Sequence, residues 1–151
     1  MVYELFTNKV LIIPGVAWAV AQVMKTCIIL VRDKRLDLRL LFSTGGMPSS
    51  HSAVVAAMAT VVALIYGVGS VAFGIAAIVA GIVISDAAGV RQSVGEQAEA
   101  LNRIMEELRY KRITEFEREL KEFIGHTQFQ VIIGAIIGIL IAWVWITATG
   151  A

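Results

Sequence analysis

Two histidines, His51 and His126, are the side chains of this sequence best suited to proton transfer or nucleophilic attack. His51 follows the run Gly45-Gly46-Met47-Pro48-Ser49-Ser50 and leads into a long apolar segment. This pattern predicts a loop entering a helix, where unpaired N–H groups and the helix dipole favour a phosphate-like anion. An imidazole, with an ordinary pKa of about 6.5, would suit acid–base chemistry beside that anion. The alternative is that Ser49 or Ser50 only caps the helix.

Three cations accompany the histidines. Lys25 and Arg32 are seven residues apart, which places them on one face of a helix and about 10 Å apart along its axis. Arg91 follows a later apolar segment, and its guanidinium suits bidentate contact with phosphate oxygens. The alternatives are that Lys25 snorkels to the membrane interface and that Arg91 pairs with Asp86.

This set suggests phosphoryl transfer. One imidazole would attack phosphorus, the other would protonate the leaving oxygen, and the cations would hold the equatorial oxygens. Zinc is the competing use of the histidines, but two histidines without a cysteine or a His-Glu-x-x-His spacing are a poor ligand set. A divalent metal, if used, would recruit Asp86 and Glu96. We therefore expect neither a metal nor another cofactor.

The elements that position these residues are membrane helices. The 151 residues are 58% hydrophobic with a mean hydropathy of +0.77, which exceeds the usual range of soluble domains. We expect an all-α integral membrane protein, one domain over residues 1–151, in contact with the lipid bilayer. Its first apolar segment has 22 residues and would cover about 33 Å as a helix, enough for a bilayer core. Four transmembrane helices are expected, at residues 10–31, 50–66, 70–90 and 127–148.

The insertion between the third and fourth spans, residues 92–125, is charged and amphipathic. Val94, Ala98, Leu101 and Leu108 recur at helical spacing with charged residues opposite, which predicts a membrane-peripheral helix. A second helix is expected from Thr114, where Thr-Glu-Phe-Glu fits a capping box. The sequence thus predicts one or two amphipathic helices between the third and fourth spans.

The charge distribution predicts the topology and limits the partners. The connections 32–48 and 91–125 hold eleven of the thirteen Lys and Arg residues, which favours a multi-pass cell-membrane protein with both connections cytoplasmic and both termini outside. The N-terminus has no basic residue before Lys9, so we expect no cleaved signal peptide. A net charge of +1 argues against nucleic acid as a partner.

The last apolar segment contains Gly134-x-x-x-Gly138, which offers a flat surface for close helix packing. That contact could lie within one chain or between subunits. A homo-oligomer formed through Gly134 and Gly138 is therefore one expectation.

Four strings together resemble a known family: Ser43–Ala53, Asp86–Arg91, Gln97–Asn102 and Gly125–Thr127. They closely resemble the divergent type 2 phosphatidic acid phosphatases, membrane proteins also described as acid phosphatase or vanadium-dependent haloperoxidase-related. The resemblance covers nearly the whole chain. It implies a membrane phosphatase acting on a phosphorylated lipid or small phosphate ester.

The wider phosphatase superfamily implies roles for individual residues. Its first motif binds phosphate through a lysine and, seven residues later, an arginine followed by proline. Lys25 and Arg32 match it, but Asp33 replaces the proline. Its second motif is Pro-Ser-Gly-His with the histidine as acid. His51 and Ser49 match, while Ser50 replaces the glycine.

The third motif departs further from the pattern. His126 can take the place of the nucleophile, but Gln130 stands where an aspartate would orient it. Arg91 lies 35 residues before His126, where the superfamily has a short spacing. A glutamine brings no negative charge to stabilise an imidazolium, so Asp86 would have to assist or catalysis would be weaker.

We expect a lipid phosphatase in which His126 attacks and His51 acts as the acid, while Lys25, Arg32, Ser49, Ser50 and Arg91 hold phosphate and Asp86 and Gln130 support. The alternative is a non-catalytic membrane protein that binds an anionic headgroup or phosphorylated ligand. A transporter or channel is less favoured, because polar residues do not line a path along any one helix.

Overall fold

The computed structural model describes residues 2–34, 46–110 and 127–150, and these are almost entirely helical. The second histidine, His126, and the second expected amphipathic helix lie outside the described residues. Residues 35–45, between α2 and Gly46, lie outside them as well. The helices, in chain order, are α1 Val2–Thr7, α2 Lys9–Asp33, α3 Ser50–Tyr66, α4 Val71–Ser85, a π-helical turn Asp86–Val90, α5 Arg91–Tyr110 and α6 Gln128–Thr149.

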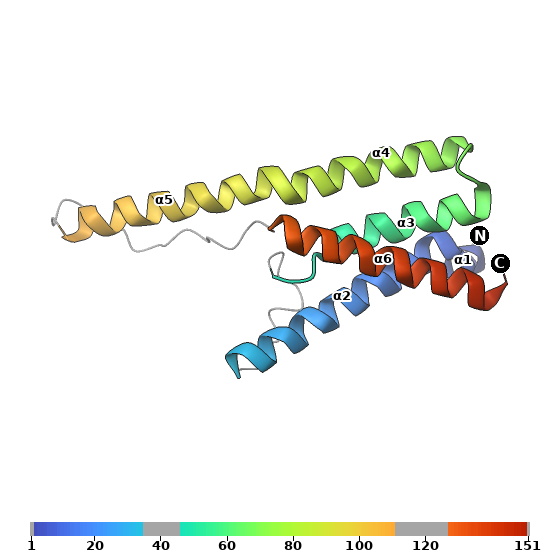
Figure 1. The fold of residues 1–151 in the computed structure, drawn as a ribbon, viewed down its shortest axis with the longest axis horizontal. Helices are drawn as coiled ribbons and strands as arrows, with labels where there is room; N and C mark the ends of the chain where they lie inside the picture. Colours follow the sequence, from blue (N-terminus) through green and yellow to red (C-terminus); the bar gives the residue numbers. More distant parts are fainter. Residues whose placement is uncertain (1, 35–45, 111–126, 151) are drawn as a thin grey trace.

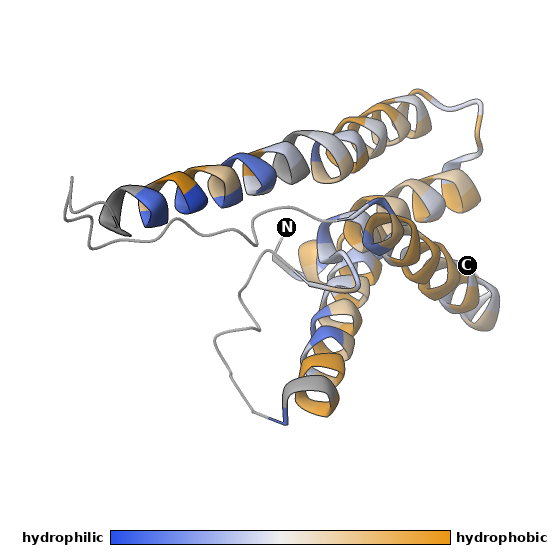
Figure 2. Ribbon diagram, turned by 60° about the vertical axis from the view of Figure 1, so that its left-hand side comes forward, coloured by the Kyte–Doolittle hydropathy of each residue, from blue (hydrophilic) through white to orange (hydrophobic). Residues whose placement is uncertain are grey.

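The centre of the fold is α3, which packs against α2, α4 and α6 (Figure 1). The core between α2, α3 and α6 is built mainly from small side chains, which let the helices approach closely. Its buried members are Ile13, Ala17 and Ala21 of α2, Ala53, Ala57 and Val61 of α3, and Ala142 and Ile146 of α6. The outward faces of these helices are largely apolar (Figure 2), as expected of surfaces that meet lipid.

The glycine pair of α6 packs against α3 within the chain. A Cβ at Gly134 would lie 2.2 Å from the carbonyl oxygen of Ser49, and one at Gly138 would lie 2.1 Å from that of Ala53. The second contact lies four residues after the first on both helices, so α3 and α6 run parallel and in register. This surface is occupied inside one chain, so an oligomer formed through these two glycines does not fit the packing.

Among the described residues, three helical stretches are long and apolar enough to cross a membrane: Lys9–Val31, Val71–Glu107 and Gln128–Thr149. The fourth apolar helix, α3, has 17 residues and a length of about 25 Å. The chain is therefore an all-helical, multi-pass membrane protein. Whether α3 completes a fourth crossing stays a prediction.

The amphipathic helix α5 follows α4 without a loop between them. It continues the axis of α4 through the π-helical turn and extends beyond the bundle as part of one long rod (Figure 1). Its outer face is charged, and Glu99 and Arg103 form the ion pair that their spacing predicts. The change from apolar to charged sequence at residue 91 thus occurs within a continuous helix.

Both termini and the α3–α4 turn lie at one end of the bundle (Figure 1). Toward the opposite end, the part of α2 that carries Lys25 lies near the starts of α3 and α6, while the last turns of α2 project away from the bundle (Figure 1). We call this opposite end the motif end, because Lys25, Ser49 and His51 belong to the helix segments that meet there.

Candidate functional site

The start of α3 is buried among its neighbours. Ser49 is its N-cap: its Oγ accepts a hydrogen bond from the Ser52 N–H at 3.4 Å and lies 3.0 Å from Ser52 Oγ, within hydrogen-bond distance. Ser49, Ser50 and Ser52 are all almost completely buried. The capping role proposed as the alternative for Ser49 is therefore present. Ser50 and His51 occupy the first two helical positions, whose N–H groups have no carbonyl partner within the helix itself.

The lysine of the first span is fully buried, with a relative exposure of 0%. Its alkyl chain lies under the loop that enters α3, since a Cβ at Gly46 would meet Lys25 Cγ and Cδ at 3.4 Å. Gly46 has φ +93°, a conformation that favours glycine. The lysine therefore lies beneath the loop rather than along the lipid surface, and this burial argues against simple snorkelling. In the same loop, the peptide bond between Met47 and Pro48 is cis.

A backbone hydrogen bond connects the starts of α3 and α6. The Ser49 N–H donates to the carbonyl oxygen of Gln130 at 3.1 Å. Gly134, one turn later, lets the α6 backbone lie directly against Ser49. Thr127, the N-cap of α6, is the residue after His126, so α6 begins next to the capped end of α3.

The structure gives Gln130 a role in capping α6. Its Oε1 accepts a hydrogen bond from the Thr127 N–H at 3.2 Å, and its own N–H donates to Thr127 Oγ1 at 3.4 Å. These two bonds form a capping box. In the sequence pattern, Gln130 stands where an aspartate would orient His126. The structure shows that its side-chain oxygen accepts the Thr127 N–H instead of serving only that purpose.

His51 is the second residue of α3 and is partly exposed, but its Nδ1 atom is buried. Gln22 of α2 also has a buried Oε1 and lies three residues before Lys25, on the same helix face. Sequence reasoning did not single out Gln22 or Ser52. The available signal for Gln22 was its position one turn from Lys25 in an otherwise apolar segment.

Three predicted residues remain: Arg32, Arg91 and Asp86. Arg32 and Arg91 belong to α2 and α5, and their side chains are outside the described set. Asp86 begins the π-helical turn, is partly buried, and has its N–H directed at the carbonyls of both Ile82 and Val83. This turn contacts the α6 helix. Within the described residues, no three His, Cys, Asp or Glu side chains form a group that could hold a metal ion.

Comparison with known proteins adds the family. The model of the Divergent PAP2 family matches residues 6–141, which cover the buried lysine, the capped start of α3 and the π-helical turn. The chain belongs to this family. It is also 41% identical to the "Uncharacterized membrane protein YuiD" of Bacillus subtilis (strain 168), over 93% of this chain and 96% of that protein. No solved structure matches the chain.

Proposed function

We propose that this divergent PAP2 family member hydrolyses the phosphate ester of a phosphorylated lipid at the motif end of the bundle. The observation that carries the proposal is the burial of Lys25 beneath the glycine loop that leads into the capped start of α3. A buried ammonium is costly unless an anion or hydrogen-bond acceptors compensate its charge. In this proposal the buried Lys25 ammonium contributes positive charge to a phosphate group bound at this end.

The start of α3 supplies the donors for phosphate. In this proposal the phosphate lies at the N-terminus of α3, beside the Ser49 cap, where the helix dipole and the first-turn N–H groups favour an anion. Arg32 and Arg91 add charge to equatorial oxygens in this proposal. The site is on the cytoplasmic side if the charge distribution sets the topology.

The chemistry follows the two histidines. A ring nitrogen of His126 attacks phosphorus, the bond from phosphorus to the lipid oxygen breaks, and His51 transfers its proton to that leaving oxygen. Water then attacks the phosphohistidine, gives its proton to His51, and releases inorganic phosphate as the nitrogen–phosphorus bond breaks. The position of His126 directly before the α6 cap supports this assignment.

The test is phosphate release by the purified full-length protein in detergent or nanodiscs, using phosphatidic acid and isoprenyl phosphates as substrates. We expect His126→Gln and His51→Gln each to lower turnover by about 10²-fold or more. Lys34→Gln is the matched control, because Lys34 is an exposed cation just past the end of α2. Absence of release by the wild type, or unchanged release in both histidine variants, would refute the mechanism.

The second candidate is a non-catalytic receptor for an anionic headgroup in the same site. The identity and role of Gln130 favour it, because a neutral amide brings no charge to a nucleophilic histidine and its oxygen accepts the Thr127 N–H in the capping box. This candidate predicts that the wild type binds phosphatidic acid without releasing phosphate. Binding should then weaken in a Lys25→Met variant and change only gradually in the histidine variants.

A further inference from the structure

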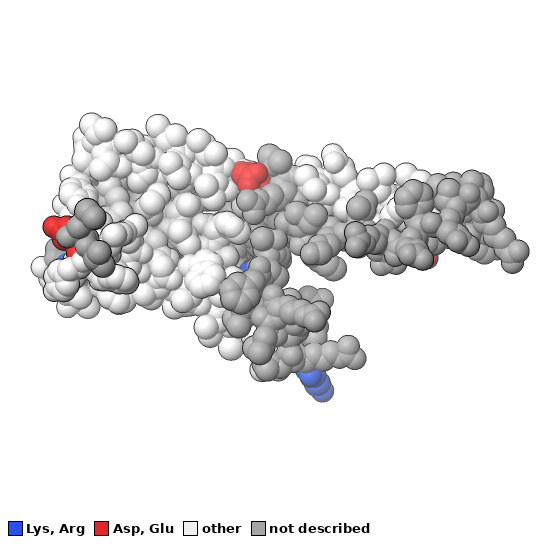
Figure 3. All heavy atoms as spheres, turned by 180° about the vertical axis from the view of Figure 1, so that it is seen from behind, with Lys and Arg blue, Asp and Glu red and all other residues white. Residues whose placement is uncertain are grey.

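The rod formed by α4, the π-helical turn and α5 presents an apolar stripe that no described helix covers. Of the apolar window of each span, 17% is buried within the chain for Val71–Glu107, against 33% for Lys9–Val31 and 28% for Gln128–Thr149. Figure 3 shows the α4 part of the rod as an uncharged surface. The stripe consists of large apolar side chains that are 40–65% exposed: Ile75, Ile78 and Ile82 of α4 and Val94, Leu101 and Ile104 of α5.

The spacing within this apolar stripe is that of a parallel coiled coil. Its α4 members recur at intervals of three and four residues, and so do Val94, Gln97, Leu101 and Ile104 in α5. The π-helical turn aligns the two halves. Ile82 and Val94 are twelve positions apart, and the extra residue of the π turn reduces this to about eleven α-helical positions, or about three full turns. The two halves of the stripe therefore lie on one side of the rod.

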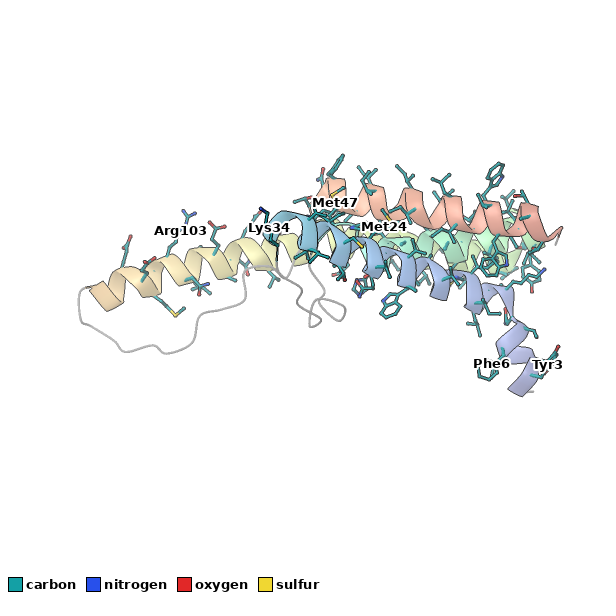
Figure 4. The ribbon with its side chains drawn as sticks, turned by 90° about the horizontal axis from the view of Figure 1, so that it is seen from below. Tyr3, Phe6, Met24, Lys34, Met47 and Arg103 are labelled. Atoms are coloured by element: carbon teal, nitrogen blue, oxygen red, sulfur yellow. The ribbon has the colours of Figure 1, made fainter. Side chains whose placement is uncertain are left out.

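The α5 half of the stripe extends beyond the membrane. Residues 71–110 have a helical length of about 60 Å, about twice the thickness of a bilayer core. Because α5 continues the axis of α4, it projects from the membrane rather than lying on its surface, and no other described helix runs beside it (Figure 4). The chain already buries Gly95 and Ala98 on one flank of α5. The exposed flank, with Leu101 and Ile104, needs a partner that water and lipid do not supply.

We propose that a second copy of this chain covers the apolar stripe in a parallel dimer, with its two-fold axis along the membrane normal. Both copies share one orientation in the membrane, so α4 meets α4 and α5 meets α5. An open groove of about 670 Å³ on α4 is lined by Ile78, Gly81 and Ile82, with Ser85 and Asp86 at its end. An isoleucine from the second copy would fill part of this groove, as a knob fills a hole.

The charge distribution on α5 favours a second copy as the partner. In a two-fold contact the same face of each subunit is used, so a charged residue there would lie near its own copy, which is unfavourable. Helical spacing places the charged side chains that the structure describes in α5 away from the stripe. These residues are Glu96, Glu99, Arg103, Glu106 and Glu107. Since the α5 half alone has only about two heptads, the contact along α4 must contribute to the stability of the dimer.

The test is disulfide cross-linking of the purified full-length protein in lipid vesicles, at a high ratio of lipid to protein. The only native cysteine is first removed by Cys27→Ser. Leu101→Cys is compared with Glu99→Cys, a matched control because Leu101 is 49% exposed and the Glu99 side chain 50%. We expect Leu101→Cys to form a dimer of two 16.3 kDa chains about tenfold faster or more, since the dimer holds its two thiols together.

A second measurement uses native mass spectrometry of the same protein without added cysteines. Leu101→Glu places like charges across the contact and should convert the dimer to a monomer, whereas Arg103→Glu, on the opposite face, should leave it a dimer. Equal cross-linking of the two cysteine variants, no cross-linking of either, or a dimer that survives Leu101→Glu would overturn the proposal. So would a fast disulfide within one chain in Leu101→Cys/Phe116→Cys, which would assign the stripe to residues 111–126.

Discussion

Substituting Gly138 by alanine should separate α3 from α6. The new Cβ would lie 2.1 Å from the carbonyl oxygen of Ala53, 2.9 Å from its carbonyl carbon and 3.0 Å from its Cα. All three atoms are backbone, so no rotamer change can remove the clash. To bring the shortest contact from 2.1 Å to 3.0 Å, the helices must move apart by about 0.9 Å.

The cost of this movement can be estimated from the contacts it weakens. A gap of about 0.5–1 Å already removes about a quarter to a half of the dispersion energy of the atoms facing it. Overpacked cores typically lose about 1–3 kcal/mol. A similar shift near the helix start would also lengthen the 3.1 Å hydrogen bond from Ser49 to Gln130, which is worth about 0.5–1.5 kcal/mol. We therefore expect Gly138→Ala to destabilise the fold by about 2–4 kcal/mol.

The assay is reversible unfolding in detergent micelles, followed by circular dichroism or by thermal denaturation. The matched controls are Gly74→Ala and Gly81→Ala in α4, because a Cβ at either position meets nothing within 4 Å. Both controls should be neutral or slightly stabilising, by up to about 1 kcal/mol, since alanine is the better helix former. If Gly138→Ala unfolds together with these controls, the parallel α3–α6 packing described above is wrong.

Three further predictions concern the motif end. Gly46→Ala should cost about 1–3 kcal/mol, because φ +93° strains any residue with a Cβ, and thermal unfolding measures the loss. Lys25→Met should leave unfolding stability unchanged or raised while phosphate release or phosphatidic acid binding falls by about tenfold or more; a loss of both would instead assign the lysine a structural role. Gln130→Glu should preserve the α6 cap, since glutamate also completes a capping box with Thr127, whereas Gln130→Ala should lose about 0.5–1.5 kcal/mol in the same unfolding assay.

The sequence predicted the helices of the bundle well, because each is a long apolar block with clear start signals. The helix α3 begins and ends at the residues expected, and α6 is shifted by one residue at each end. Serine or threonine caps mark both starts. The short helix α1 was not expected, because six residues are too few to show a periodic pattern.

The direction of α5 could not be predicted from composition. A change from apolar to charged residues at position 91 reports a change of surroundings, and this was interpreted as the start of a separate peripheral helix. No proline interrupts residues 71–110, so the backbone can continue as one helix with a single π-helical turn. Hydropathy alone does not show that the helix continues across position 91.

The site residues stay predictions, although one neighbour relation among them is visible in the structure. A four-span reading of the sequence puts Lys25 and His51 toward the same membrane face, and the structure places the Lys25 alkyl chain against Gly46, in the loop before the helix that carries His51. Burial of the lysine depends on a loop conformation that propensities do not specify. The capping role of Gln130 was also missed, although the sequence Thr127-Gln-Phe-Gln130 contains the capping-box spacing. The catalytic roles stay predictions.

The glycine packing connects the fold to the proposed chemistry. Gly134 lies against the carbonyl of Ser49, and the same serine caps the helix that would receive phosphate. The distance between the start of α3 and Thr127, the N-cap of α6, therefore depends on how closely α6 can approach α3. A side chain at Gly134 would displace the serine backbone directly, whereas one at Gly138 acts a full turn further into the membrane. If the motif end binds phosphate as proposed, Gly134→Ala should impair binding more than Gly138→Ala at equal loss of stability. Equal impairment by the two variants would mean that binding depends only on global folding.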